Sequence, residues 1–204
     1  MALTTNSRHR HRRIDATGGA AGNERLTAMT GAVLLVLFAA EGVTILRIRE
    51  LLTVHFFLGM LLLGPVALKV ASTGYRFARY YTGSGPYVRK GPPAPLMRLL
   101  GPLVIATSLS VLGTGVLLAI IGPGNPRWLF LHKASFVLWF GVMTIHVLVY
   151  APRLPGLLIG GHTRDRAAAV LSGSGVRWLL LAASLACGLV LAAATLHLTT
   201  RWEA

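Results

Sequence analysis

Five long apolar segments constrain this chain more than any other feature. They cover residues 26–46, 51–72, 99–121, 128–150 and 176–198. Each has about the 20 residues that a helix needs to cross the roughly 30 Å hydrocarbon layer of a bilayer. Lipid offers no hydrogen bonds to the backbone, and a helix satisfies its own. The sequence therefore predicts an all-α membrane protein with five transmembrane helices, four of which form a bundle.

The composition supports the same conclusion. Apolar residues make up 54% of the 204 residues and charged residues only 13%, which is too little polar surface to cover a water-soluble globule. Membrane lipid is therefore the expected partner of the outer surface. The net charge of +14 does not indicate nucleic acid, because the basic residues flank the apolar segments, as orientation in a membrane with anionic headgroups requires.

The basic residues predict the orientation. Most of the 20 lysines and arginines lie in residues 8–25, 76–98 and 153–177, which share one side of the membrane if all five segments cross it. Lys and Arg accumulate on the cytoplasmic side of short loops. We therefore expect residues 1–25 to form a disordered, basic cytoplasmic tail. Residues 199–204 should form a short exoplasmic C-terminus.

Ionisable residues inside a bilayer are costly and usually mark function. In this chain they are Glu41, His55, Lys69, His132, Lys133, His146 and His197. His55 and His132 each begin a helix that runs inward from the exoplasmic side, so they should reach a similar depth. Two imidazoles at one level of a helical bundle can supply both axial ligands of a haem iron. The alternative is a pair of interfacial histidines that hydrogen-bond to their neighbours.

A second level lies deeper. His146 follows His132 by 14 residues, which places it on the same helix face about 21 Å away. Lys69 follows His55 by the same interval, so the inner level pairs a histidine with a lysine that we expect to snorkel towards the cytoplasmic headgroups. One haem is therefore favoured over two. An interhelical hydrogen bond is the alternative role of His146.

The remaining polar residues have weaker assignments. Glu41 is expected to be protonated or to pair with Arg47 or Lys133, with a haem propionate or quinone protonation as the functional alternative. Lys133 would contact either a propionate or lipid headgroups, and His197 is interpreted as an interfacial residue that could serve as a ligand.

Small residues should allow close approach of helices or of a macrocycle. The candidates for such contacts are Gly59, Gly64, Gly113, Gly115 and Gly141. The lone cysteine, Cys187, lies in the small-residue run 184–188 and is assigned to helix packing. Pro65 should kink the second helix and free a backbone carbonyl.

Two segments resemble a known family. Leu131-His132-Lys133-Ala134-Ser135-Phe136, with His146 downstream, and Val54-His55-Phe56-Phe57-Leu58-Gly59 look like the bacterial membrane cytochromes b, including the cytochrome b561-like group. The resemblance implies a haem b bundle that passes electrons between a quinol or membrane partner and an exoplasmic redox protein, alone or within an oxidoreductase. It assigns His55 and His132 to one haem. It assigns His146 to a second haem whose partner position holds Lys69.

Two other functions remain open. One is a membrane reductase of a metal ion or small oxidant, although the chain has no flavin or nicotinamide motif to supply electrons. The other is a haem-free scaffold or transporter component in which the histidines hold helices together. The oligomeric state is left open.

Overall fold

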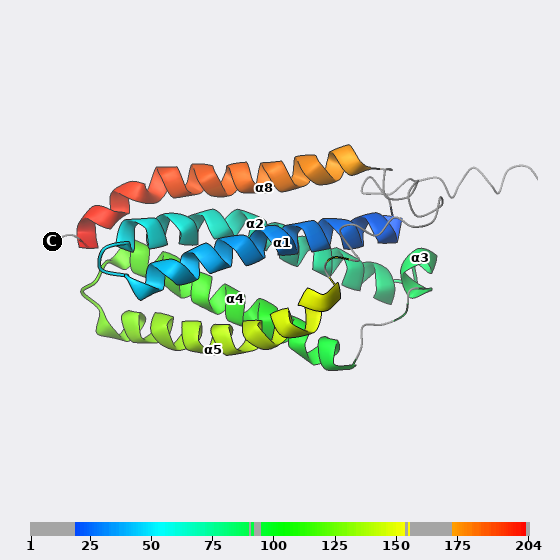
Figure 1. Ribbon diagram of the computed structural model, residues 1–204, viewed down its shortest axis with the longest axis horizontal. Coiled ribbons are helices and arrows are strands. Elements are labelled where there is room, and N and C mark those ends of the chain that lie inside the picture. The colour runs from blue at the N-terminus through cyan, green and yellow to red at the C-terminus, as the bar shows by residue number, and fades with distance from the viewer. Residues whose placement is uncertain (1–18, 90, 92–94, 154, 156–172, 203–204) are drawn as a thin grey trace, which may run out of the picture.

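The computed structural model describes residues 19–89, 91, 95–153, 155 and 173–202, and within them it contains helices and no strand (Figure 1). Five helices are long and apolar enough to cross a membrane. They are α1 (Gly19–Leu46), α2 (Leu52–Tyr81), α4 (Pro95–Ile121), α5 (Pro126–Tyr150) and α8 (Ser174–Thr195). The short helices are α3 (Gly85–Val88), η1 (Ala151–Arg153) and η2 (Leu196–Trp202). The prediction of an all-α protein with five transmembrane helices is confirmed.

The five long helices lie roughly side by side along the longest axis of the molecule (Figure 1). The connection between α1 and α2, the connection between α4 and α5, and η2 lie at one end. The start of α1 and helix α3 lie at the other end. The first and last described residues are therefore at opposite ends, as five crossings require. Which end faces the cytoplasm stays a prediction from the basic residues.

Two helices extend beyond their predicted bounds. Helix α1 begins at Gly19, so residues 19–25 form its first turns and do not belong to the predicted tail. Residues 1–18 of that tail lie outside the described part. Helix α2 continues past residue 72 to Tyr81. A hydropathy window detects only the part of a helix that lies in lipid, whereas backbone hydrogen bonding continues into the polar interface. The other bounds differ from the predicted ones by a few residues.

The helices form two groups that share a core. Helix α2 packs between α1 and α8, and α4 packs along α5. Leu34 of α1 and two residues of α2, Leu62 and Val66, form a buried cluster that Leu112 of α4 contacts. Phe38 of α1 lies against Trp139 of α5, with ring centroids 4.7 Å apart. Helices α1, α2, α4 and α5 thus form a four-helix bundle, and α8 covers the side of α2 that faces away from α5 (Figure 1).

Glycines bring α2 and α8 into backbone contact. A Cβ atom added to Gly188 would collide with the carbonyl oxygen of Leu61, and one added to Gly64 would collide with the carbonyl oxygen of Ser184. The oxygen of Leu61 is the one that Pro65, lacking an N–H, cannot bond within the helix. A glycine Cα–H therefore meets each carbonyl, a weak hydrogen bond that recurs at helix interfaces. The predicted role of the small residues is confirmed for Ser184 and Gly188.

Cys187 itself does not take part in this contact. Its side chain is exposed on the surface of α8, next to the glycine that packs against α2. Ser184 and Gly188 make the predicted contact with α2, and Cys187 does not, because the cysteine lies on a different face of the helix.

We expect Gly188→Ala to lower the thermal stability of the protein. The added Cβ meets backbone that cannot rotate away, and overpacking of this kind costs about 1–3 kcal/mol. The measurement is the unfolding midpoint of purified protein in one detergent. The matched control is Gly141→Ala, because a Cβ at Gly141 meets no atom within 4 Å. Equal midpoints for the two variants would contradict the α2–α8 contact.

Candidate functional site

The fold brings His55 and His132 together. His55 lies in the first turn of α2 and His132 in the second turn of α5, and the centroids of their rings are 6.5 Å apart with the ring planes at 72°. Both side chains are partly buried. The two histidines that the sequence places at a similar depth are therefore neighbours across the bundle.

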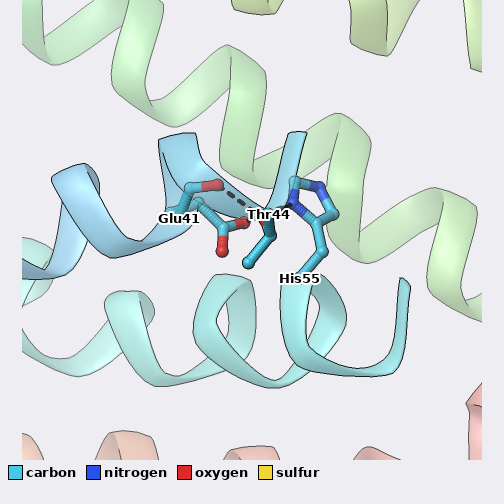
Figure 2. Close-up of polar contacts among 3 residues, drawn as sticks. All are labelled: Glu41, Thr44 and His55. Atoms are coloured by element: carbon cyan, nitrogen blue, oxygen red, sulfur yellow. Dashed lines mark hydrogen bonds and ion pairs between the residues drawn. The ribbon is translucent and has the colours of Figure 1, made fainter. Parts of the chain in front are cut away.

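Two residues of α1 hold the His55 ring. The Nδ1 atom of His55 lies 2.9 Å from the hydroxyl of Thr44 and 3.0 Å from Oε1 of Glu41 (Figure 2). Thr44 donates its own hydroxyl proton to the backbone carbonyl of Glu41, at 2.6 Å. Because that proton is used, the Thr44 oxygen accepts a hydrogen bond, which favours the tautomer of His55 that carries its proton on Nδ1.

One residue of α4 holds the His132 ring in the same way. The Nδ1 atom of His132 lies 3.1 Å from the hydroxyl of Thr114. Thr114 donates to the backbone carbonyl of Ser110 one turn earlier, at 2.7 Å, so its oxygen also accepts from the ring. Ser135 lies 3.2 Å from the same threonine oxygen and donates to the backbone carbonyl of His132. His132 is therefore also an Nδ1–H donor.

Each Nδ1 is fixed by these contacts, and the tautomer that carries its proton on Nδ1 leaves a lone pair on Nε2. His132 has a further hydrogen bond with the backbone of Val111. Metal-binding histidines have this arrangement, in which the second ring nitrogen donates to a carboxylate or another acceptor. Imidazole–metal bonds are about 2.0 Å long, so two nitrogens on one ion are about 4 Å apart and the ring centroids lie farther apart. The observed 6.5 Å is compatible with such a pair.

Two of the predicted glycines lie at this site. A Cβ at Gly59 would be 3.5 Å from Oε1 of Glu41, and a Cβ at Gly115 would be 3.1 Å from Cε1 of His132. Both glycines therefore make room for the groups that position the rings. The other candidates lie elsewhere: Gly64 contacts α8, and a Cβ at Gly113 or Gly141 would meet no atom within 4 Å.

Glu41 has a different partner from the two that the sequence suggested. Its contact is His55, while the Nη1 atom of Arg47 lies 3.8 Å from Glu50 and Lys133 is exposed on α5. Glu41 and Thr44 are three residues apart on α1 and so share the face that meets α2. The second oxygen of Glu41, Oε2, is buried and has no hydrogen-bond partner among the described residues.

The inner level is arranged differently from our expectation. Lys69 does not reach towards the end of its helix; its Nζ atom donates to the carbonyl of Thr27 on α1, at 2.6 Å. His146 packs on Tyr150, with ring centroids 4.7 Å apart. The two residues that follow the histidine pair by 14 positions thus share a second level. His197 is exposed, and its Nδ1 atom lies 2.9 Å from the carbonyl of Ala194.

Sequence reasoning missed the two threonines. Thr44 and Thr114 resemble ordinary helix residues whose hydroxyls bond to the preceding turn, and only the pairing of α1 with α2 and of α4 with α5 places them beside a histidine. The spacing of Thr44 from Glu41 is the one local signal that could have indicated it, since an acidic residue in a membrane helix needs a polar neighbour.

Comparisons of the chain with protein-family models, curated proteins and solved structures found no match. Among the described residues no group of three or more His, Cys, Asp or Glu side chains is arranged to hold a metal ion by itself. The resemblance to membrane cytochromes b therefore stays a prediction.

We expect both histidines to be in the Nδ1–H form when the protein is prepared without a cofactor, because each Nδ1 faces a threonine oxygen whose proton is donated to the helix backbone. The measurement is the ¹⁵N chemical shift of selectively labelled histidines, assigned with His→Gln variants. Thr44→Val and Thr114→Val should each convert one ring to a mixture of tautomers. Thr144→Val, which removes an exposed back-bonded hydroxyl of α5, should change neither. Nε2–H forms in the unmodified protein would contradict this assignment.

Proposed function

We propose that this chain is a membrane-embedded b-type cytochrome in which His55 and His132 are the axial ligands of one haem. The observation that carries the proposal is that the rings of His55 and His132 are neighbours, with centroids 6.5 Å apart, and that each Nδ1 is held by a threonine. The alternative is that the two histidines only hydrogen-bond to their neighbours, as they do to Thr44 and Thr114, and haem content distinguishes the two functions.

The donor set fits haem better than a bare metal ion. A porphyrin supplies four of the six iron ligands, so two histidines suffice, whereas a protein site for zinc needs three or four side chains. The described residues offer the pair and no larger group. Haem b, when bound, supplies a one-electron carrier. Gly59 makes room for Glu41 and Gly115 makes room for the His132 ring, and Thr44 and Thr114 set the ring orientations.

The proposed redox partners follow from the position of the histidine pair in the membrane. The distribution of basic residues supports a cytoplasmic N-terminus, which puts the histidine pair near the exoplasmic face. At that end the connections between helices are short, so a separate redox protein is needed to carry electrons away from the membrane. A quinol is the proposed source of electrons inside the membrane. The chain would then serve as an electron-transfer subunit and catalyse no bond formation of its own.

Haem content tests the proposal. Protein purified after expression with ample haem should show one haem b per chain in its reduced-minus-oxidised spectrum. His55→Ala and His132→Ala should each lose at least most of it, because one axial bond is removed. The matched control is His146→Ala, which should keep the haem because His146 belongs to the inner level. Protein without haem would leave a histidine-bearing scaffold or transporter component as the better function.

A second test concerns Glu41. Oε1 of Glu41 lies 3.0 Å from Nδ1 of His55, and an ionised carboxylate there would make the ring a stronger donor to ferric iron. Glu41→Gln should therefore raise the midpoint potential of the haem while leaving the haem bound. For a one-electron couple, each tenfold change in the equilibrium is about 59 mV. Redox titration followed in the visible spectrum measures the shift. Glu50→Gln, an exposed glutamate at the same end, is the control, and an unshifted potential in Glu41→Gln would remove Glu41 from the site.

A further inference from the structure

The end of α2 that lies opposite to the histidine pair carries a cluster of arginine and aromatic side chains that the proposed function does not use. Helix α3 packs against α2 there (Figure 1). The stretch 73–89, which forms this part of the molecule, contains three arginines and no Asp or Glu. We call the cluster the α2–α3 corner, and it consists of Arg76, Phe77, Arg79, Tyr81, Tyr87 and Arg89.

The α2–α3 corner lies at the level of the lipid headgroups. The roughly 30 Å hydrocarbon layer takes about 20 residues of helix, so the part of α2 in lipid ends near Ser72. Arg76 and Arg79 follow within about two further turns. On the same turns the rings of Phe77 and Tyr81 are exposed, with centroids 4.4 Å apart, and aromatic residues of this kind are enriched at membrane interfaces. Lipid phosphates therefore lie at the depth of these arginines.

The end of α2 fixes the position of the Arg79 side chain. Gly83, with a φ of +75°, turns the chain back, and the N–H of Ser84 donates to the carbonyl of Arg79, at 3.0 Å. This turn brings Tyr87 against α2, where its ring is buried and the Cζ atom of Arg79 lies 5.9 Å from the ring centroid. A cation over an aromatic face is attracted by the ring quadrupole. The guanidinium group of Arg79 is therefore held at a defined place at the headgroup level.

The donors of the α2–α3 corner lack an anion. The Nε atom of Arg79 is buried and has no hydrogen-bond partner among the described residues. Arg89 also lies against α3, because its Nη1 atom would be 3.2 Å from a Cβ added to Gly85. In the described part of the chain, no carboxylate forms an ion pair with Arg76, Arg79 or Arg89. The corner therefore offers guanidinium donors to an acceptor from outside the described chain.

We propose that the α2–α3 corner binds the phosphate of an anionic phospholipid, with Arg79 as the main ligand. The planar guanidinium group presents paired N–H donors that match two phosphate oxygens. Three positive charges without a carboxylate favour phosphatidylglycerol over phosphatidylcholine, whose choline group they repel. The acyl chains lie beside the exposed rings of Phe77 and Tyr81, which a free phosphate ester would not use. This inference goes beyond the proposed function and holds whether or not haem is bound.

The test is native mass spectrometry of the full chain in detergent, titrated separately with phosphatidylglycerol and phosphatidylcholine. Unmodified protein should bind phosphatidylglycerol about tenfold more tightly, the effect of one charge-assisted hydrogen bond. Arg79→Gln should lose this preference. Arg79→Lys keeps the charge and loses the paired donors, so it should bind phosphatidylglycerol about threefold more weakly than unmodified protein. Arg49→Gln is the control and should keep the preference, because Arg49 is exposed at the opposite end of the molecule.

A second variant covers the case in which Arg79→Gln lowers the unfolding midpoint. Arg89 is exposed, so Arg89→Gln should leave the midpoint unchanged and weaken phosphatidylglycerol binding in the same direction. Unchanged preference in both glutamine variants would overturn the inference. Full affinity in Arg79→Lys would overturn it too, since binding would then depend on net charge alone. Displacement of the bound lipid by glycerol phosphate would indicate a site for free phosphate esters and overturn the assignment to lipid.

Discussion

Polar groups that lie in a bilayer must find their hydrogen bonds within the protein, and this constraint organises the whole molecule. It makes each apolar segment a helix. It also explains why threonine hydroxyls bond to the preceding turn, as Thr114 does to Ser110. At Pro65, where the helix loses a donor, the carbonyl of Leu61 meets Gly188 of the neighbouring helix. The close contact between α2 and α8 thus also gives the Leu61 carbonyl a partner in place of the missing backbone hydrogen bond.

The same constraint sets the chemistry of the histidine pair. A threonine in water could give its proton to any acceptor, but in lipid Thr44 and Thr114 give theirs to the helix backbone and keep an oxygen that only accepts. Each therefore fixes the proton of its histidine on Nδ1. Helix geometry thereby sets the orientation of each ring and directs Nε2 away from the threonine. On this basis we propose that the pair binds a metal centre.

Much of this arrangement was predictable from the sequence. The apolar segments and the charges around them gave the number of helices, and the positions of His55 and His132 at the starts of two helices that run in the same direction predicted their shared depth. The ends of helices were less predictable: α1 and α2 both continue into the polar interface, where hydropathy carries no signal. The predicted direction of the Lys69 side chain, towards the headgroups, was wrong. The space over Gly31 admits its ammonium group, and the carbonyl of Thr27 accepts its hydrogen bond inside the bundle.

The sequence by itself determined that the chain is a five-helix membrane protein with polar residues at two depths, because hydrophobicity and helical rise are properties of single segments. Only the tertiary structure decided which groups meet at each depth. It paired Glu41 with His55 instead of a cation, and it put Thr114 on His132. Those contacts depend on how helices distant in sequence are rotated against one another, and that rotation is set by packing between them, which no single segment encodes.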